Sequence, residues 1–561
     1  MFVFKMMFGA VFAFVIMHFS TALLYTEYFY NPKLVFYIFN NFEFYNLPLL
    51  LKVSYSIAML MFFLFFFVKI RPMNLYGFSK YATKKDIKKF KLLANSGIFM
   101  GEYVKVDKKD TRDEKLYKRT HKTLMMDEPL SVGIIAPPGT GKTSTVIIPT
   151  LFKSKSSFIV SDPKGELFEK TAPTRSLFSK IIRFDPMQAH GKGAVFNPFS
   201  EELIPKDRRY VFAYVKKIAN LLIADNEKGD DSFFTTNARI MFTFVAAYLV
   251  HKNNQTSIPE IASHILSSKN VPLLFAEMVD ELSQLENDDF ISAIIKQGNA
   301  ALSSSDAQDT WGSIMTTATS ILEPFTTDAL LREATDGKNE IDILKFKKSI
   351  HTLYIVIPDE YKLVLYPLVR LLFEVTSSKL ISVSEDNKAE QVGNKRVTFL
   401  IDEFPRLGKM KEVLTLPSIS RGMGVSLVIV AQDMTQIEEI YGEKQAQGLF
   451  SLFSYWYLFS QNDMKTAKKF SEQIGNYTNK KENVSYDTKN LWFDLKSSKS
   501  FSYESLPLVS PSEILASSDD FGWVLSSKNP TRPIRVKNYK WYNDEKMLKS
   551  NKKYEYLLEL L

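Results

Sequence analysis

Two long apolar runs open the chain, before any other pattern begins. Residues 2–24 carry almost no charge apart from Lys5, and residues 47–70 are interrupted only by Lys52 and Lys69. At ~1.5 Å per residue, each run is long enough to cross ~30 Å of hydrocarbon as a helix. The pattern therefore predicts a membrane anchor of two transmembrane helices over residues 1–70. A cleavable signal peptide is the alternative for the first run, but it lacks a clear cleavage site and a second apolar run follows.

Basic residues predict how this anchor is oriented. Eight of them lie between residues 69 and 91, whereas the segment 26–46 between the runs carries Lys33 against Glu27 and Glu43. The positive-inside rule then places both termini in the cytoplasm, with a short loop outside. We interpret the lysine-rich stretch as a collar facing anionic lipid, with a specific DNA contact as the alternative.

Short apolar runs of strand length alternate with helix-length segments from residue 126 onward. Several of these runs end in acidic or turn residues, which favours a parallel α/β sheet with its site at the carboxyl ends of the strands. The predicted strands are 132–135, 157–161, 181–184, 353–357, 396–404, 425–431, 455–460 and 522–525.

Residues 251–320 break this alternation and predict short amphipathic helices, such as Ile258–Leu266 and Val271–Leu282. The segment holds three lysines against nine acidic residues, inside a chain whose formal net charge is +9. An acidic surface repels DNA phosphates, so we expect it to receive a protein with a basic face. A merely solvated helix face is the alternative.

Composition narrows the chemistry further. The 561 residues can form several cores, and the mild basic excess is compatible with nucleic acid or anionic lipid as partner. There are no cysteines, which excludes disulfides, cysteine-ligated zinc and iron–sulfur clusters. The six histidines are scattered, without the spacing of metal ligands.

A glycine-rich turn joins the first strand of the predicted core to a helix. Its members are Ala136, Pro137, Pro138, Gly139, Thr140, Gly141, Lys142, Thr143 and Ser144. Strand, turn and helix in this order are typical of a P-loop, whose backbone N–H groups and helix N-terminus bind phosphate. Lys142 would reach the β- and γ-phosphates of ATP, and the Thr143 hydroxyl would ligate Mg²⁺. Ala136 stands where the usual pattern has glycine, which we interpret as a tolerated variant; a chance loop match is the alternative.

A second motif pairs with this turn. The apolar run Arg396–Phe404 ends in two carboxylates, as a Walker B strand does. Asp402 would complete the Mg²⁺ shell, and Glu403 would orient and deprotonate the attacking water. A buried strand followed by an acidic helix start is the alternative, and it loses weight because a P-loop is present in the same chain.

Several further motifs resemble one family. Asp-Pro-Lys-Gly-Glu-Leu (162–167) in register with the P-loop is similar to the type IV secretion coupling proteins of the TraG/TraD/VirD family. Phe-Asn-Pro-Phe (196–199), Phe233-Phe234 with Ala238-Arg239, Arg-Gly-Met-Gly (421–424), the strand-end Gln432 and Tyr441-Gly442 extend the similarity over about residues 126–535.

The resemblance implies a RecA-like P-loop NTPase core with an inserted all-α domain, preceded by two transmembrane helices, and a homo-hexamer in the inner membrane. It assigns Gln432 to sensing the γ-phosphate and makes Arg421 the arginine finger of a neighbouring subunit; an ordinary surface or salt-bridge role is the alternative for Arg421. It implies single-stranded DNA with a relaxase, or an effector protein, as cargo, and the secretion channel as partner.

The expected organisation follows from these motifs. It is a membrane anchor (1–70), a cytoplasmic linker or stalk (71–125), a nucleotide-binding domain in two parts (126–250 and 321–535), the all-α insertion (251–320) and a C-terminal tail (536–561). Within the second part, the polar residues 476–505 predict a surface loop. The expected function is ATP-driven transfer of DNA or protein. The alternative is a membrane-tethered docking receptor in which nucleotide acts only as an assembly switch.

Overall fold

The structure is a computed structural model, and it describes most of the chain after residue 74. The described residues are 15, 49, 52–53, 56–60, 75–106, 117–188, 193–223, 232–286, 288–305, 307–385, 395–486 and 497–561. The chain divides into two compact units, Met1–Leu75 and Tyr76–Leu561. The two predicted transmembrane runs lie almost wholly outside the described residues and stay predictions.

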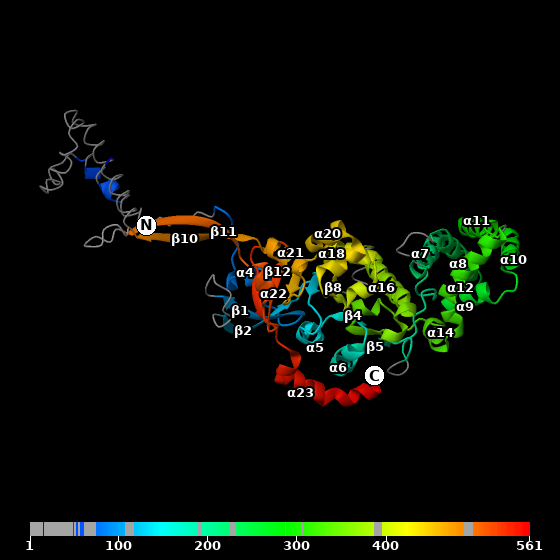
Figure 1. Ribbon diagram of the computed structural model, residues 1–561. Coiled ribbons are helices and arrows are strands. Elements are labelled where there is room, and N and C mark those ends of the chain that lie inside the picture. The colour runs from blue at the N-terminus through cyan, green and yellow to red at the C-terminus, as the bar shows by residue number, and fades with distance from the viewer. Residues whose placement is uncertain are drawn as a thin grey trace. The chain divides into compact units, whose positions relative to one another are not determined.

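An eleven-stranded sheet forms the centre of the second unit (Figure 1). Its strand order is β2-β1-β13-β12-β9-β3-β8-β7-β4-β6-β5. The seven strands from β9 to β5 are parallel, and the four from β2 to β12 join them antiparallel. The bounds are β1 Ile98–Val106, β2 Tyr117–Met126, β3 Val132–Ile135, β4 Ser157–Asp162, β5 Lys180–Phe184, β6 His351–Val356, β7 Val397–Ile401, β8 Val425–Ala431, β9 Tyr455–Leu458, β12 Phe521–Ser526 and β13 Ile534–Lys537.

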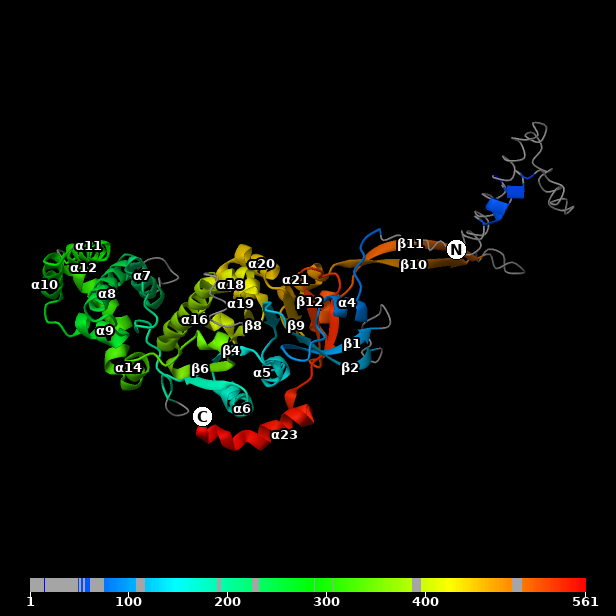
Figure 2. The ribbon, with the colours of Figure 1, turned by 180° about the vertical axis from the view of Figure 1, so that it is seen from behind.

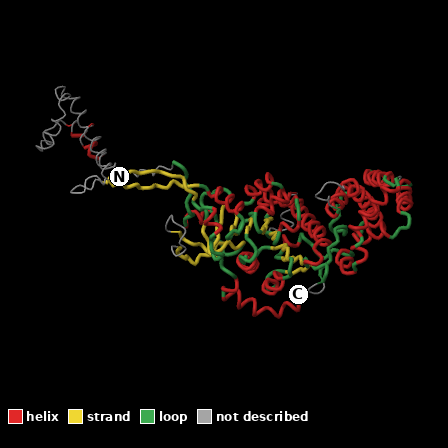
Figure 3. The backbone as a smooth tube through the Cα atoms, viewed as in Figure 1, coloured by secondary structure: helices red, strands yellow, loops and turns green. Residues whose placement is uncertain are grey.

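Hydrophobic side chains cover both faces of the parallel strands. Every residue of β3, β7 and β8 is buried. Successive residues belong to different clusters: Ile134 packs in one core and Ile135 in the other, as neighbours on a strand must when both faces are covered. Figure 3 shows the helices that cover the two faces. This burial explains why the sequence placed β3 and β8 with their observed bounds.

The covering helices divide between the two cores. One core takes α4 (Lys84–Lys89), α5 (Ile148–Lys153), α6 (Glu166–Arg175) and the C-terminal α23 (Glu545–Tyr554). The other takes α16 (Lys362–Glu385), α18 (Lys411–Met423), α19 (Met434–Tyr441), α20 (Glu443–Leu452) and α21 (Met464–Ile474), and the short α22 (Pro511–Leu515) follows the hairpin strands.

A helical region is inserted between β5 and β6, and Figure 2 shows it from behind at the end of the sheet. Polar caps start several of its helices, such as Ser257 before α9 and Asp288 before α11. The predicted boundaries at 251 and 320 are too narrow, because the helices begin before residue 251 and continue past residue 320. The helices are α7 Val211–Leu222, α8 Ser232–Asn253, α9 Ile258–Leu266, α10 Val271–Ser283, α11 Asp289–Ser303, α12 Gln308–Leu322, α13 Pro324–Thr327 and α14 Ala329–Thr335.

The central helix of this region, α8, is unusually apolar. Residues Phe233–Asn253 are the one described stretch that is long and apolar enough to cross a membrane by length and composition. Most of this stretch is buried among the neighbouring helices, with Phe244 against Phe275 of α10. It is therefore a core helix of the inserted region by its packing.

The predicted stalk at 71–125 is wrong for its described part. The segment forms α4 and the strands β1 and β2, which extend the sheet at its antiparallel edge. Its charged residues obscured the strands, because an edge strand such as β2 (Tyr117–Met126) carries Lys118, Arg119 and Lys122 among its polar positions.

The predicted surface loop at 476–505 is also wrong. Two long antiparallel strands, β10 (Asn476–Tyr486) and β11 (Ser497–Pro507), form a separate two-stranded ribbon there. A ribbon outside the main sheet leaves most side chains in water, so it needs few apolar residues, and Phe501 is half exposed. The polar composition that predicted a loop fits this ribbon equally well.

Candidate functional site

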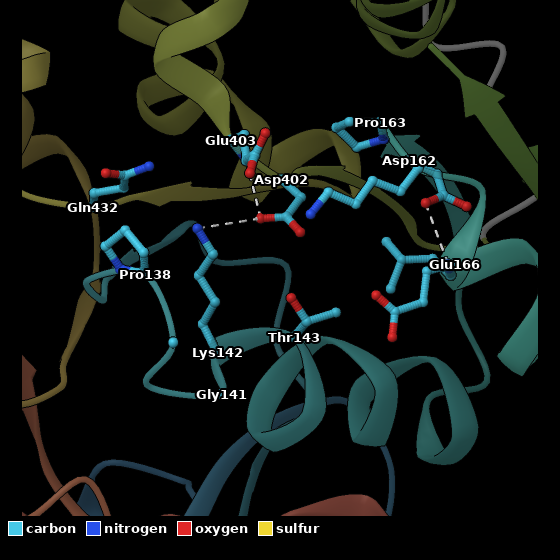
Figure 4. Close-up of a pocket in the computed structure, with 13 residues that line it drawn as sticks. Pro138, Gly141, Lys142, Thr143, Asp162, Pro163, Glu166, Asp402, Glu403 and Gln432 are labelled. Atoms are coloured by element: carbon cyan, nitrogen blue, oxygen red, sulfur yellow. Dashed lines mark hydrogen bonds and ion pairs between the residues drawn. The ribbon is translucent and has the colours of Figure 1, made fainter. Parts of the chain in front are cut away.

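The predicted site residues meet at the carboxyl ends of three neighbouring parallel strands. The turn after β3 supplies Lys142 and Thr143, the end of β7 supplies Asp402 and Glu403, and the end of β8 supplies Gln432. One pocket is lined by all five side chains (Figure 4). Adjacent parallel strands end at the same edge, so residues almost 300 positions apart come together.

The turn itself has the backbone that phosphate binding requires. Gly139 and Gly141 have φ values of 81° and 82°, a region that side-chain-bearing residues rarely adopt. The Thr140 hydroxyl donates a hydrogen bond of 2.8 Å to the Pro137 carbonyl and closes the turn. Ala136 is fully buried, and its N–H donates to the Ala431 carbonyl at 3.0 Å. The alanine that departs from the usual pattern therefore belongs to the sheet core.

Lys142 and Asp402 approach each other across the pocket. The Lys142 Nζ lies 4.0 Å from Asp402 Oδ1, with both side chains largely buried. Burial raises the pKa of the Asp402 carboxyl, and the charge of Lys142 opposes this rise. A carboxylate held out of water beside a single lysine is an incomplete arrangement, since a buried charge is stabilised by further ligands or partners.

Glu403 is held in an uncommon conformation. Its φ of 51° is left-handed, and its N–H donates to Asp402 Oδ1 at 2.9 Å. Its carboxylate pairs with Arg406 Nη1 at 2.9 Å, and the same nitrogen lies 3.2 Å from Asp359 Oδ1. Non-glycine residues with positive φ concentrate at functional sites because the surrounding structure must hold them there. Arg406 therefore fixes the Glu403 carboxylate in this conformation.

The Asp162–Leu167 motif lines the far side of the same pocket, a role that the site prediction missed. Asp162 is buried at the end of β4 and accepts hydrogen bonds from the N–H groups of Leu167 (3.2 Å) and Phe168 (2.8 Å) at the start of α6. Burial raises the pKa of Asp162 to about 7, and these two hydrogen bonds act against the rise. The sequence held a signal for this role, because Asp162 directly follows the next strand predicted after the P-loop.

The structure places the Gln432 side chain at the pocket but does not describe the Arg421 side chain. Gln432 lines the pocket, and its N–H donates to Gln436 Oε1 at 3.4 Å. Arg421 lies in the last turn of α18, and its side chain is outside the described ones. Its role as an arginine finger stays a prediction. Ser144 follows the turn in a π-helical segment, Thr143–Ile147, and its hydroxyl donates to the Gly141 carbonyl at 3.0 Å.

A P-loop at the edge of a parallel sheet, facing an acidic strand end, defines an α/β fold of the P-loop NTPase type. The family model described as "Type IV secretory system Conjugative DNA transfer" matches residues 80–559. The chain therefore belongs to this family of type IV coupling proteins, and the predicted family membership is confirmed.

Curated relatives agree with this assignment. The chain is 25% identical to Protein VirD4 of Agrobacterium fabrum over 417 residues, which cover 73% of this chain and 58% of that protein. It is 25% identical to the conjugal transfer protein TraG of Escherichia coli over 471 residues, which cover 79% and 71%. The chain thus spans little more than half the length of VirD4.

Solved structures show the same fold. The bacterial conjugative coupling protein TrwBdeltaN70 has a TM-score of 0.56 at 17% identity, covering 83% of this chain and 93% of that one. TrwB in complex with ADP and Mg²⁺ has a TM-score of 0.52 at 18% identity, covering 74% and 85%. The predicted α/β P-loop fold is confirmed, whereas the two transmembrane helices are not among the described elements.

Proposed function

We propose that this protein hydrolyses ATP in the pocket beside Lys142 and uses the energy to transfer cargo through a type IV secretion channel. The cargo is DNA, in single-stranded form with its relaxase, or an effector protein. The protein acts as a homo-hexamer, multi-pass in the inner membrane, with its ATPase part in the cytoplasm. Family membership supports the coupling role, and the apolar runs at 2–24 and 47–70 support the anchor.

The observation that carries the proposal is the meeting of Lys142 with Asp402 and Glu403. The P-loop lysine lies 4.0 Å from the first of two carboxylates at the end of β7, which β8 separates from β3 in the sheet. The pocket also holds the Thr143 hydroxyl and the Gln432 amide. These are the groups that phosphoryl transfer needs: a cation, a metal ligand pair, a base and a polar contact for the γ-phosphate.

Each residue has a distinct task in this proposal. Lys142 binds the β- and γ-phosphates, with the backbone N–H groups of residues 139–144 around them. Thr143 and Asp402 hold Mg²⁺, which neutralises charge on the phosphate oxygens when bound. Two protein ligands suit this ion, since Mg²⁺ keeps waters and phosphate oxygens as its other ligands. The described residues contain no cluster of three His, Cys, Asp or Glu, which agrees with such an open site.

Glu403 acts on the attacking water. Its carboxylate orients the water and accepts its proton, while Gln432 contacts the γ-phosphate and Arg421 of a neighbouring subunit stabilises the developing charge. Glu403 is paired with Arg406 here. The ion pair with Arg406 holds the Glu403 carboxylate in place. When the carboxylate accepts a proton, this ion pair must break or weaken.

Two complexes of a relative support the proposal that the pocket binds a nucleotide. TrwB is described in complexes with ADP and Mg²⁺ and with a non-hydrolysable ATP analogue, ADPNP. The pocket of this chain offers the lysine, hydroxyl and carboxylate that such a ligand pairs with.

The helical region is the proposed docking surface for a protein partner with a basic face. Its acidic residues include Glu286, Asp288 and Asp289, all exposed. Asp288 pairs with Arg208 at 2.9 Å and caps α11, so part of this charge is already used within the protein. Glu286 and Asp289 are the better candidates for a partner's basic groups.

The test is ATP turnover by the full-length protein in nanodiscs, with and without single-stranded DNA. We expect Lys142→Ala and Glu403→Gln to lower the rate by about 10²–10⁴-fold. Lys444→Ala, which changes an exposed lysine of α20 outside the pocket, is the matched control. Lack of turnover by the wild type under every condition, with cargo binding intact, would favour the docking receptor instead.

A further inference from the structure

The C-terminal segment, residues 538–561, runs beside the P-loop and its helix. Figures 1 and 2 both show α23 lying along α6, on the side of the sheet that carries α5. Asn551 donates to the Lys170 carbonyl of α6 at 2.7 Å, and Asp544 pairs with Lys153 of α5 at 3.7 Å. The segment therefore contacts α5, which continues the π-helical segment that follows the P-loop, and α6, whose first residues Glu166 and Leu167 line the nucleotide pocket.

Two anchors fix the chain on either side of Lys540. Asn538 is buried; its Oδ1 accepts from the Tyr457 hydroxyl at 2.8 Å and its Nδ2 donates to the Asp519 carbonyl at 2.7 Å. Trp541 is also buried, with its ring 5.9 Å from that of Phe152 in α5. Lys540 lies between these anchors, so its backbone has little freedom.

The side chain of Lys540 reaches the phosphate-binding turn. A methyl group placed on Gly141 would lie 3.5 Å from Lys540 Cε, 3.2 Å from Ser144 Oγ and 3.8 Å from Thr145 Oγ1. The lysine is half-buried, and within the described part of the chain no carboxylate pairs with its ammonium. A cation held in such a place without a partner is the arrangement expected next to an anion.

A second, independent observation lies at the same point. Thr145 is fully buried, and among the described residues its hydroxyl has no hydrogen-bond partner. An unsatisfied buried hydroxyl needs an explanation, and a bound ligand is one. Thr145 Oγ1 and Lys540 Cε lie near the same face of Gly141, and neither residue lines the pocket that Lys142, Asp402, Glu403 and Gln432 form.

We propose that Lys540 of the C-terminal segment binds the α-phosphate of the nucleotide, with the Thr145 hydroxyl beside it. The inference rests on the proposed function, because it requires a nucleotide on the P-loop. The γ-phosphate lies toward the two carboxylates, so the α-phosphate lies at the opposite end of the turn, where Ser144, Thr145 and Lys540 gather. ADP and ATP share this phosphate, so Lys540 strengthens binding of both and does not distinguish them.

The test is a charge series at position 540 in the full-length protein, read as ADP and ATP dissociation constants by displacement of a fluorescent nucleotide. Lys540→Met should weaken both by about tenfold, and Lys540→Glu by more, whereas Lys540→Arg should retain most of the affinity. Lys546→Met, an exposed lysine of the same segment, is the matched control. Pyrophosphate, which lacks an α-phosphate, should displace the probe equally well from wild type and Lys540→Met.

Each other outcome overturns the assignment. Unchanged ADP affinity in Lys540→Met would show that Lys540 does not contact the nucleotide. Equal losses of affinity in the Met and Arg variants would show that Lys540 acts through packing and that its charge is not needed. An equal loss for pyrophosphate would place the ammonium on the β-phosphate. A wild type that binds no nucleotide would instead refute the proposed function, so the two failures are distinguishable.

Discussion

The parallel and antiparallel parts of the sheet carry different kinds of residues at their ends. Three of the seven parallel strands, β4, β7 and β8, end at Asp162, before Asp402 and Glu403, and before Gln432, and these residues line one pocket with Lys142. The four antiparallel strands contribute no residue to that pocket. They instead carry the chain into the C-terminal segment, which packs on α5 and α6. The parallel part supplies the reactive groups, and the antiparallel part holds a support against the P-loop helix.

This difference follows from strand direction. Parallel neighbours end at one edge, where their side chains and the following helix N-termini converge on a ligand. Antiparallel neighbours alternate in direction, so their ends are shared between two edges and no such convergence arises. Substitutions that lower ATP turnover without loss of stability should therefore fall in the parallel part, as the Lys142 and Glu403 variants are expected to show.

Arg175 is the strongest exception to this division, and it gives the largest expected effect on stability. It is fully buried beneath the parallel strands, yet it does not line the nucleotide pocket. Its guanidinium donates to Thr352 Oγ1 at 2.8 Å and to the carbonyls of Leu151, Ser154 and Ser156 at 2.6, 3.0 and 2.8 Å. Burial lowers its pKa to about 10, so it stays charged at neutral pH.

Arg175→Met should therefore lower the free energy of unfolding by about 3–5 kcal/mol, because it leaves several buried acceptors without a donor. The measurement is urea-induced unfolding followed by circular dichroism. The ADP affinity of the folded variant should stay near that of wild type. A large loss of ADP affinity in protein that is still folded would mean that Arg175 also shapes the pocket.

Trp541 tests the antiparallel side of the comparison. It follows β13 and packs its buried ring against Phe152 of α5. Trp541→Ala should cost about 3 kcal/mol of unfolding free energy, at the low end for a buried tryptophan because the site lies near the surface. Tyr556→Ala is the control, since Tyr556 is an exposed aromatic residue of the same segment. Equal stability of the two variants would show that the C-terminal segment is not anchored by this ring.

The same division decides how much the sequence could predict. The strands β3 and β8 were placed with their observed bounds, because strands buried on both faces are continuous apolar runs. The pocket was predicted for a related reason: Asp402 and Gln432 follow such runs directly, and Lys142 follows one across the glycine-rich turn. The edge strand β2 and the ribbon β10–β11 were missed because exposed strands need no apolar periodicity. The strand β1 was missed in the same charged segment, although its residues 98–104 are buried.

Lys540 could not have been predicted in this way. It lies 398 positions after Lys142, in a segment with no phosphate-binding motif, and only the folded chain brings it to Gly141. The role of Asp162 was partly visible as a strand-end acid within a family motif. Its burial, and the N–H groups that it accepts from, depend on how α6 packs.

Asp162 gives the smallest expected effect and sharpens the comparison on the parallel side. Its folded pKa of about 7 lies above the value of about 3.9 for an unfolded aspartate. Between these values the folded state binds more protons than the unfolded state, so stability is highest at low pH and falls as pH rises toward 7. The slope that Asp162 contributes is at most about 1.4 kcal/mol per pH unit.

Asp162→Asn should remove that slope, because the amide stays neutral while its oxygen still accepts from the Phe168 N–H. The measurement is the unfolding free energy of nucleotide-free wild type and variant at several pH values between about 5 and 8. The gap between the two proteins should change steadily up to about pH 7 and then level off. A constant gap across this range would mean that Asp162 is ionised throughout, with more solvent or cation near it than its buried position at the end of β4 provides. The carboxylates at the ends of the parallel strands would then be solvated. That result would contradict the low-dielectric pocket on which the proposed chemistry depends.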